Sequence, residues 1–379
     1  MNRAGKYVDN LTGEAAYQSF KPNPLPPIPE IEMDEEIVRL LVDANKQLVK
    51  LDTASQLISN ADLFISMYVR KEALISSQIE GTQCTLDDVL DPEVETNTNL
   101  DVSDVINYVK TTQYALKRLE KLPLCCRLIR EVHEVLMEGV RGQDKTPGEF
   151  RYSQNWIGPA NCSLKDARYV PPNVEDMQNA MSDLEKFINE NVDYDPLIRV
   201  ALIHYQFETV HPFLDGNGRI GRLLILLYLM EQGLLVKPVI YISYFLKKNQ
   251  VEYYDRISEV RRSGNFEQWI RFFLEAVSKA ASDSLEAICQ LSALHDRNIE
   301  KLPKTTRSKD NLRAVFDYIE QYPIIDIKKT AKELEVSYNT VATAVKKLVE
   351  IGILQETTNA ARNRVFAYEE YLGIMRRDT

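Results

Sequence analysis

Apolar residues recur every three or four positions through most of the chain, and this spacing constrains the fold more than any other feature. Between Met33 and Ser59, one face of a helix would carry Ile37, Leu40, Leu41, Ala44, Leu48 and Leu51. The same spacing predicts further helices at residues 61–79, 102–120, 125–138, 174–190, 194–209, 218–232, 248–262, 266–282 and 283–298. The sequence therefore predicts a mainly α-helical protein.

Two segments interrupt the helical pattern. The first thirty residues end in KPNPLPPIPE, where proline removes backbone donors and clashes with the preceding turn, so we expect an extended arm along the surface. Residues 144–173 are rich in Gly, Pro, Asn and aromatic side chains, a composition typical of a loop or hairpin.

The last seventy residues predict a small domain of their own. Helices are expected at 311–322, 326–334 and 340–351, followed by two strands in GILQE and RVFAYEE, with Ser337 as a helix N-cap. This order is that of a winged helix-turn-helix. The polar segment 301–310 would be a linker, so we expect an N-terminal helical region (1–100), a helical core (101–300) and a winged-helix domain (301–379).

Charge differs between the predicted domains. The whole chain carries 46 Lys and Arg against 56 Asp and Glu, a net charge of −10. Residues 301–379 hold 14 basic and 11 acidic residues, a net of +3, whereas the remainder is at −13. Winged helices bind either nucleic acids or proteins, and both partners stay open. If DNA is bound, the expected phosphate contacts are Lys346, Lys347, Arg362 and Arg364.

Composition excludes several classes of protein. Hydrophobic residues at 44% are enough for packed cores, which excludes wholesale disorder. The longest apolar run, LLILLYLM, is far shorter than the ~20 residues that span a bilayer, and the N-terminus has no apolar block like that of a signal peptide. We therefore expect a cytoplasmic protein with no membrane partner. The five cysteines form no CxxC pair, and we expect reduced, mostly buried thiols and no zinc site.

The segment HPFLDGNGRIGR, from His211 to Arg222, concentrates the residues with chemical potential. His211 precedes proline at the end of a predicted helix, and this biases it away from helical angles and toward a cleft. Gly216, Asn217 and Gly218 can turn their amides toward one point. An apolar helix follows directly, and a glycine-rich loop at a helix N-terminus is an anion-binding site.

The charged residues of this segment fit a polyphosphate. Arg219 and Arg222 are three positions apart and are expected to share a helix face. Asp215 supplies a hard carboxylate oxygen that suits Mg²⁺ held jointly with a nucleotide. We predict that residues 216–222, with Ile220 and Gly221 among them, bind the nucleotide. A merely polar turn before a helix would not need so many special residues, so the segment indicates phosphoryl or nucleotidyl transfer.

These twelve residues match the Fic-domain signature HPFx(D/E)GNGRxxR at every defined position, and the chain resembles that family over most of its length. Fic enzymes are mostly helical, and the typical member transfers AMP from ATP to a hydroxyl of a target protein. The resemblance implies that His211 is the general base, that Asp215 holds Mg²⁺, and that residues 216–218 form the anion hole. Arg219 and Arg222 would bind the β- and γ-phosphates. Because the related Doc kinases lack this glycine pair, nucleotidyl transfer is favoured.

A second resemblance lies upstream, in SSQIEG at residues 76–81. Glu80 is predicted at a helix C-terminus, where the helix dipole disfavours a carboxylate unless a cation is near. The segment is similar to the family's inhibitory pattern (S/T)xxxE(G/N), which implies that Glu80 pairs with Arg222 and prevents productive ATP binding. The alternative is a solvated glutamate before a glycine that ends the helix.

Two more segments resemble parts of the family's nucleotide site. Residues 149–173 fit the hairpin flap that lies across the site, and residues 241–257 fit the region that encloses the adenine. The latter resemblance implies nucleotide contacts for Lys248 and Asn249. His204 lies seven residues before His211, and we expect it to be a core histidine instead of a second base.

The sequence thus predicts a protein adenylyltransferase that uses ATP and Mg²⁺, acts on a Tyr, Ser or Thr hydroxyl of a target protein, and is inhibited by Glu80. Because a base must be neutral, activity is expected to fall below roughly pH 6.5, the reference pKa of histidine. The alternatives are a hydrolase that removes AMP, with Glu80 positioning water, and an ATP-sensing DNA-binding regulator. The sequence leaves a homodimer open and does not name the target.

Overall fold

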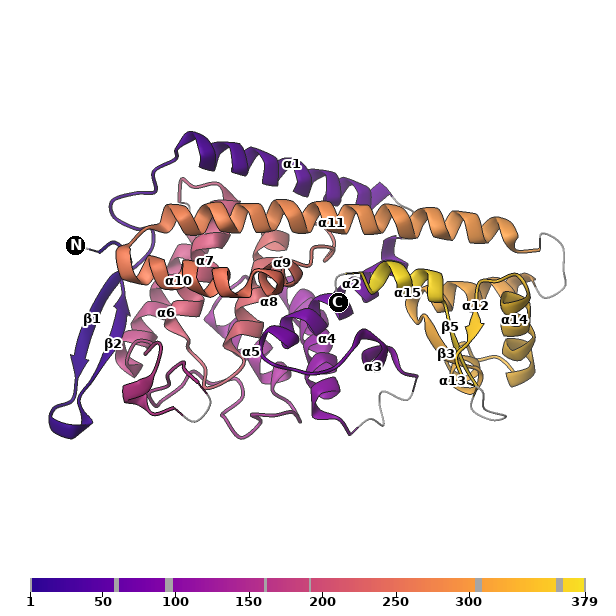
Figure 1. Ribbon diagram of the computed structural model, residues 1–379, viewed down its shortest axis with the longest axis horizontal. Coiled ribbons are helices and arrows are strands. Elements are labelled where there is room, and N and C mark those ends of the chain that lie inside the picture. Colours follow the sequence, from indigo (N-terminus) through magenta and orange to yellow (C-terminus); the bar gives the residue numbers. More distant parts are fainter. Residues whose placement is uncertain are drawn as a thin grey trace.

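The protein is mainly helical, as predicted. The computed structural model describes residues 2–57, 61–92, 98–159, 162–190, 192–303, 309–358 and 364–377, with backbone alone for 61–63 and 309. Before the C-terminal region the helices are α1 (Glu35–Leu57), α2 (Ala61–Ile79), α3 (Leu86–Leu90), α4 (Leu100–Leu119), α5 (Cys126–Leu136), α6 (Val174–Asn189), α7 (Pro196–Val210), α8 (Asn217–Glu231), α9 (Ser243–Lys248), α10 (Gln250–Ser263) and α11 (Phe266–Lys301). Figure 1 shows their arrangement.

Helix α11 differs from the prediction. The chain forms one helix of 36 residues where the sequence predicted two, at 266–282 and 283–298. The segment between them, ASDS, contains helix-capping residue types but no Gly or Pro, so nothing in it breaks the helix. Helix α1 lies along α11 over much of its length (Figure 1) and buries the shared apolar stripe of both helices.

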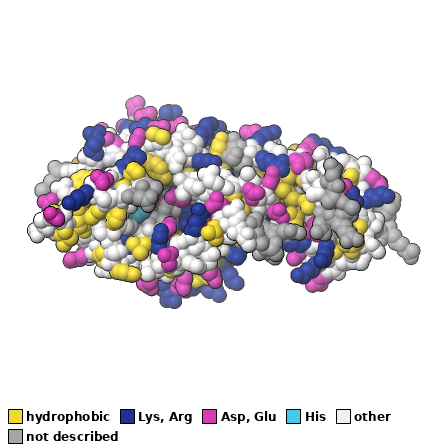
Figure 2. All heavy atoms as spheres, turned by 60° about the horizontal axis from the view of Figure 1, so that its bottom comes forward, with side chains coloured by type: hydrophobic (Ala, Val, Ile, Leu, Met, Phe, Trp, Pro, Cys, Tyr) yellow, Lys and Arg dark blue, Asp and Glu magenta, His cyan; other side chains and the backbone are white. Residues whose placement is uncertain are grey.

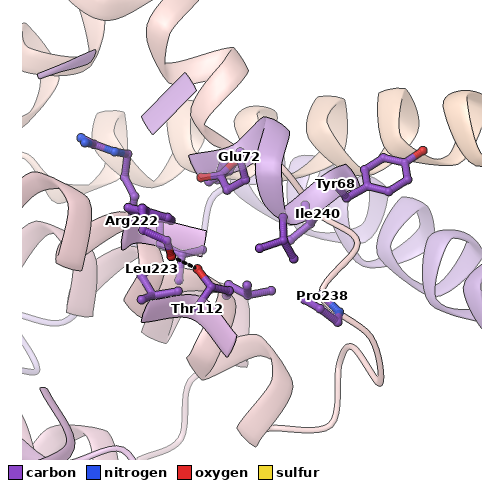
Figure 3. Close-up of a pocket in the computed structure, with 12 residues that line it drawn as sticks. Tyr68, Glu72, Thr112, Arg222, Leu223, Pro238 and Ile240 are labelled. Atoms are coloured by element: carbon purple, nitrogen blue, oxygen red, sulfur yellow. Dashed lines mark hydrogen bonds between the residues drawn. The ribbon is translucent and has the colours of Figure 1, made fainter. Parts of the chain in front are cut away.

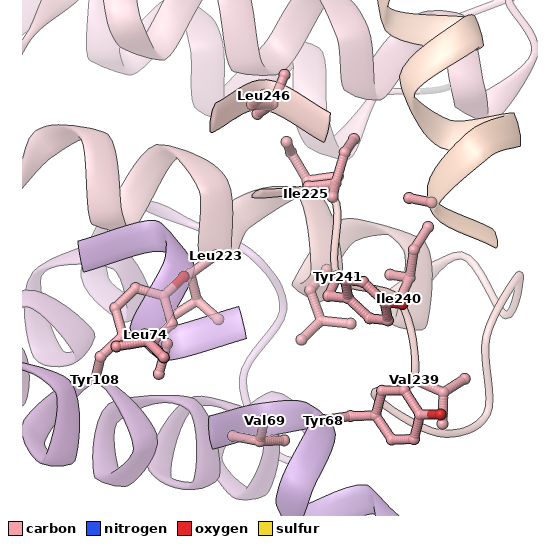
Figure 4. Packing of buried hydrophobic residues seen from close by; sticks show 14 of the residues in the cluster. Tyr68, Val69, Leu74, Tyr108, Leu223, Ile225, Val239, Ile240, Tyr241 and Leu246 are labelled. Carbon is pink, nitrogen blue, oxygen red and sulfur yellow. The ribbon is translucent and has the colours of Figure 1, made fainter. Parts of the chain in front are cut away.

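The core that positions the candidate site is formed by α2, α4, α7 and α8. Helix α7 is buried almost along its entire length, and α8 packs beside it. Figure 4 shows how Leu74 of α2, Tyr108 of α4 and Leu223 of α8 face one another in this core. The strongly apolar sequence after the glycine-rich loop therefore anchors the first turn of α8 inside the protein.

The N-terminal arm is more ordered than predicted. Strands β1 (Gly5–Asn10) and β2 (Tyr17–Pro22) form an antiparallel hairpin, and only the proline-rich part after it lacks regular structure, as expected. A Cβ on Gly5 would lie 2.2 Å from the carbonyl oxygen of Lys21, so the strands can approach this closely only with glycine there. The amide of Phe20 donates to the carbonyl of Val170 at 3.0 Å, which fastens the hairpin to the predicted flap.

The C-terminal region contains the predicted helices and strands, with two additions. Its elements are α12 (Lys309–Gln321), β3 (Ile324–Asp326), α13 (Ile327–Glu333), α14 (Tyr338–Glu350), β4 (Gln355–Glu356), β5 (Val365–Ala367) and α15 (Glu369–Met375), and its sheet has the order β3-β5-β4. Strand β3 and helix α15 were not predicted. Ser337 caps α14 by accepting from the amide of Thr340 at 3.1 Å.

Some expectations for this region stay predictions. The element order agrees with a winged helix-turn-helix, but this order alone tests neither that assignment nor the proposed domain limits. Arg362 lies outside the described residues, whereas Lys346 and Arg364 are exposed and Lys347 is half-buried.

Two general expectations can be compared with the structure. Within the described ranges, no helix combines the length and the hydropathy needed to cross a membrane. All five cysteines are free thiols, but the prediction that most are buried is wrong: Cys84 is buried, Cys289 is exposed and the other three lie between.

Candidate active site

His211 lies where α7 ends, as the His-Pro pair predicted. Its φ and ψ of 50° and 60° are left-handed, which is uncommon for a residue with a side chain. The flap holds this conformation: the carbonyl of His211 accepts hydrogen bonds from Arg151 Nε at 3.0 Å and from Asn155 Nδ2 at 3.2 Å. The backbone turn directs the imidazole into a cavity.

The cavity has a volume of about 670 Å³, within the ~300–1,000 Å³ usual for small-molecule sites. Its walls come from the end of α2, the flap, the end of α7, the start of α8, and α10. The polar residues that line it are Glu80, Arg168, Glu208, His211, Arg222, Gln250, Ser258 and Arg261. On the face shown in Figure 2, a histidine is visible in a hollow with Lys and Arg side chains close by.

The His211 imidazole is neutral at physiological pH. Burial, together with the positive charges of Arg261 and Arg151, lowers its pKa to about 4, although Glu80 acts in the opposite direction. The expectation that activity falls below roughly pH 6.5 rested on the reference pKa of histidine, and with this lower pKa we expect the fall closer to pH 4. A neutral ring that faces a cavity can accept a proton.

The glycine-rich loop forms the predicted cradle at the start of α8. Gly216 is the N-cap, with a φ of 76°, and among the described residues no side chain caps the first turn. The Asn217 side chain instead holds the loop: its Oδ1 accepts from the Phe213 amide at 2.8 Å, and its Nδ2 donates to the Phe213 carbonyl at 2.9 Å. Gly218 of this turn lines the cavity, and a helix start without a side-chain cap is a favourable place for an anion.

The Glu80 carboxylate already lies in this cradle. A Cβ on Gly218 would be 2.1 Å from Glu80 Oε1, which places the carboxylate directly against the first turn of α8. Glu80 Oε1 also accepts from Arg222 Nη2 at 2.6 Å, so the ion pair that the inhibitory pattern implied is present.

Arg222 is fixed by further contacts. Its Nε donates to Ser76 Oγ at 2.8 Å, and its Nη2 donates to the Ser76 carbonyl at 2.9 Å. Burial alone would lower the pKa of Arg222, but Glu80 and other nearby acidic groups raise it above its ordinary value. The Arg222 side chain is 1% exposed and that of Glu80 39%, so Glu80 is the partner that can leave.

Asp215 lies directly before the glycine-rich loop. Its Oδ2 pairs with Lys145 Nζ at 2.9 Å, and its Oδ1 accepts from the Gly216 amide at 2.7 Å. Burial raises its pKa, but the charges of Lys145 and Arg219 and the Gly216 amide outweigh this effect and lower it. A half-exposed, ionised carboxylate beside an anion cradle fits a Mg²⁺ ion shared with phosphate oxygens.

The two arginines of the signature do not converge as their spacing suggested. Arg219 is buried beside two carboxylates, with Nη1 3.9 Å from Asp104 Oδ1 and Nη2 3.9 Å from Asp215 Oδ1. Arg222 is held by α2 instead. Asp104 on α4 thus draws Arg219 toward the Asp215 side of the cradle, while Arg222 faces the cavity.

Ile220 and Gly221 act through packing. Ile220 is buried in the core. The Gly221 carbonyl accepts from His204 Nδ1 at 2.9 Å, and a Cβ on Gly221 would lie 2.2 Å from Glu208 Oε1. His204 also contacts the Tyr253 hydroxyl at 2.9 Å and is fully buried, which confirms it as a core histidine.

The structure does not place Lys248 and Asn249 in the cavity. The Lys248 ammonium lies 5.9 Å from the Tyr244 ring centre, and Asn249 Nδ2 donates to the Phe245 carbonyl at 2.9 Å. The first residue of this segment that lines the cavity is Gln250, at the start of α10.

Several cavity residues were missed by sequence reasoning. Gln250 Nε2 donates to the Ile79 carbonyl at 3.1 Å, which links α10 to the end of the inhibitory helix. Glu208 has a buried Oε1 with no hydrogen-bond partner within the described residues, and burial raises its pKa to about 7. Glu208 lies three residues before His211, and this closeness to the signature is the only feature of the sequence that could have pointed to it.

Arg261 of α10 was missed as well. It stacks on the flap, 3.6 Å from the Tyr169 ring centre, and donates from Nε to Thr209 Oγ1 at 3.1 Å. The Tyr169 hydroxyl donates to the Thr209 carbonyl at 2.6 Å. Arg261 therefore ties the flap to the end of α7, next to His211. No pattern in the sequence marks a buried arginine that works through such distant partners.

Comparison with known proteins agrees with this geometry. Residues 38–117 match the family model described as Fic/DOC family N-terminal, and residues 123–229 match the Fic/DOC family model. These two stretches of the chain are thus similar to the Fic/DOC family. The second match contains the entire signature together with Asp215, the flap and α7, and the first contains Glu80.

Curated proteins that are similar to part of this chain are named protein adenylyltransferase Fic. The mosquito protein from Aedes aegypti is 32% identical over 147 residues, which cover 38% of this chain and 26% of the relative. The Drosophila grimshawi protein is 29% identical over 163 residues, which cover 42% of this chain and 30% of the relative. The alignments thus span less than a third of these relatives' length.

Solved structures show the same fold. A Fic family protein from Desulfovibrio desulfuricans aligns with a TM-score of 0.57 at 18% identity, over 89% of this chain and 97% of that one. A Fic domain containing signaling protein from Bacteroides thetaiotaomicron aligns with a TM-score of 0.51 at 19% identity, over 68% and 97%. At these identities the likeness concerns the fold alone.

Proposed function

We propose that this Fic-domain chain is a protein adenylyltransferase that transfers AMP from ATP to a Tyr, Ser or Thr hydroxyl of a target protein. The observation that carries the proposal is the placement of a neutral, cavity-facing His211 beside the uncapped first turn of α8. The names of the curated relatives support the same reaction.

Each group of site residues has its own role in the proposed reaction. His211 accepts the proton of the target hydroxyl as that oxygen attacks the α-phosphorus of ATP, and pyrophosphate leaves from the opposite side. The α8 amides and Arg222 stabilise negative charge on the phosphates, because donors fixed in advance need no reorganisation during the reaction. Asp215 would hold Mg²⁺, which when bound neutralises phosphate charge.

Glu80 inhibits this reaction in the proposal. Its carboxylate occupies both partners that a phosphate needs, Arg222 and the first turn of α8. An ATP whose terminal phosphates find these sites taken would bind with its α-phosphorus away from His211. Removal of Glu80 is therefore expected to increase transfer.

The alternatives are less well supported. A hydrolase that removes AMP would need Glu80 to orient water, whereas its Oε1 is engaged by Arg222 at 2.6 Å. A DNA or protein partner of the C-terminal region is compatible with adenylyl transfer, because exposed Lys346 lies on α14, far along the sequence from the cavity residues. A homodimer is compatible as well.

The test uses ATP labelled at the α-phosphate and, in parallel, at the γ-phosphate, with Mg²⁺ and a cell extract as the source of targets. The intact chain, Glu80→Gly and His211→Ala are compared for label retained on protein after denaturation. We expect α-label only, at least tenfold stronger in Glu80→Gly and lost in His211→Ala. Retained γ-label would indicate a kinase instead, and undiminished labelling by His211→Ala would refute the proposed base.

A further inference from the structure

The inhibitory helix α2 has two functional ends. Its C-terminal end carries Ser76 and, in the following turn, Glu80, which hold Arg222. Its middle packs on the core, where the Glu72 carboxylate accepts from the Ser243 amide at 3.2 Å. Figure 3 shows Glu72 of α2 near Arg222 of α8, with Tyr68 farther along α2. Its first half reaches the C-terminal region.

Three side chains from this first half contact the C-terminal region. The ring of Phe64 packs against Tyr371 of α15 with 6.1 Å between ring centres, and both side chains are fully buried. The buried Lys71 ammonium donates to the Arg377 carbonyl, just past α15, at 2.6 Å. The Arg70 guanidinium lies 5.4 Å from the ring centre of Tyr322, which follows α12.

The segment after Glu80 is attached to the same region. Arg376 pairs with Asp87 of α3 at 2.9 Å. Lys329 Nζ donates to the Pro92 carbonyl at 2.9 Å. The turn that carries Glu80 therefore lies between two attachments to the C-terminal region, one through α2 and one through the chain that follows it.

The C-terminal region is itself fastened to α11. The buried His295 Nδ1 lies 2.7 Å from Glu320 Oε2, and Asn298 Nδ2 donates to the Tyr368 hydroxyl at 2.6 Å. Because α11 also packs on the core, it fixes the C-terminal region in place beside α2 (Figure 1).

Helix α2 can transmit a displacement along its axis. From Lys71 to Glu80 the chain advances nine residues, about 14 Å along a helix, and residues 61–79 contain no Gly or Pro at which the helix would bend. A shift of the first half would therefore reach Glu80, whose hydrogen bond to Arg222 at 2.6 Å tolerates little movement.

We propose that the C-terminal region, α12 to α15, holds the inhibitory helix in register with Arg222, and that Phe64, Arg70 and Lys71 are positioning residues that act through Glu80. This inference rests on the proposed function and adds its regulation: whatever moves the C-terminal region away from α2 releases transfer. The region is then a control element of the adenylylation site.

The experiment weakens the contact in the full-length chain. Tyr322→Ala removes a 42%-exposed ring and is expected to leave the fold intact, and Lys71→Met removes the buried donor while retaining its length. The matched control is Tyr338→Ala, which removes a 56%-exposed tyrosine from α14, a helix that packs on α12 and α13 of the same region. Each change is tested alone and together with Glu80→Gly, by α-label transfer and by hydrogen exchange of residues 72–79.

We expect Tyr322→Ala and Lys71→Met to increase labelling three- to tenfold and to speed exchange in residues 72–79, and Tyr338→Ala to change neither. In the Glu80→Gly background the same changes should add nothing, because the residue through which they act is gone. Unchanged labelling by Tyr322→Ala, or an equal increase with and without Glu80, would overturn the inference. If Glu80→Gly itself transfers no label, the proposed function has failed instead.

Discussion

The first turns of α8 and α14 begin in opposite ways. Helix α14 caps itself, since Ser337 accepts from the Thr340 amide, and its start needs no other group. Helix α8 begins at Gly216 without a side-chain cap among the described residues, and the group that meets its first turn is the Glu80 carboxylate from another helix. A helix start that lacks its own cap inside a cavity is available to an anion, whereas a self-capped start on the surface is only a structural element.

The largest loss of transfer is expected from a substitution at Gly218, in the first turn of α8. A Cβ there would lie 3.0 Å from Arg222 Nη1 even after Glu80 is removed, so Gly218→Ala narrows the space in which a phosphate would meet both groups. In the Glu80→Gly background we expect at least a 100-fold loss of α-label transfer and a matching loss of ATP binding by calorimetry. The control is Gly373→Ala in α15, where a Cβ would meet nothing within 4 Å, and transfer should be retained. ATP binding that survives in Gly218→Ala would place the phosphates elsewhere.

A smaller effect is expected from Arg261, which touches the end of α7. Its charge helps to keep the pKa of His211 low, so Arg261→Met should raise that pKa from about 4 toward the ordinary 6.5. A base works only when neutral, and the acidic limb of the pH profile of labelling should therefore move to higher pH.

The profile is measured in the Glu80→Gly background, with Arg256→Met as the control. Arg256 is on the same helix but pairs with Glu252, so its removal should leave the limb in place. If Arg261→Met lowers the rate but leaves the acidic limb of the pH profile at the same pH, Arg261 acts by holding the flap and not by its charge.

The smallest effect is expected at the self-capped helix. Ser337→Ala removes the α14 cap and should lower the free energy of unfolding by about 1 kcal/mol, measured by urea denaturation. Labelling at 25 °C should not change. The conservative Ser337→Thr keeps the capping oxygen and should restore stability, and a loss of labelling in both variants would show that α14 participates in the reaction.

The sequence predicted those features that depend on local pattern. Helical spacing and the Ser337 cap follow from neighbouring residues, and of the signature residues His211, Gly218 and Arg222 line one cavity. Contacts that join distant segments were not predictable. Arg151 and Asn155 hold His211 through its backbone carbonyl, some sixty positions away along the chain. Every residue has such a carbonyl, so the sequence does not show which one accepts the hydrogen bond.

The errors have similar causes. The spacing of Arg219 and Arg222 indicated a shared face, but Asp104 on α4 and Ser76 on α2 attract them to different sides. The sequence predicted two helices at 266–282 and 283–298, yet the chain forms one helix that packs along α1. In both cases tertiary partners outweighed a local preference.

The uninterrupted course of α11 has a consequence for substrate choice. At 1.5 Å per residue its 36 residues measure about 54 Å, and the helix packs beside α10 at one end and holds His295 and Asn298 against the C-terminal region at the other. Under the proposed function, a target protein bound at the C-terminal region would meet the cavity at a fixed distance. Only an acceptor hydroxyl at the matching distance from the bound surface would then be modified, so that geometry would select among targets with the same local sequence.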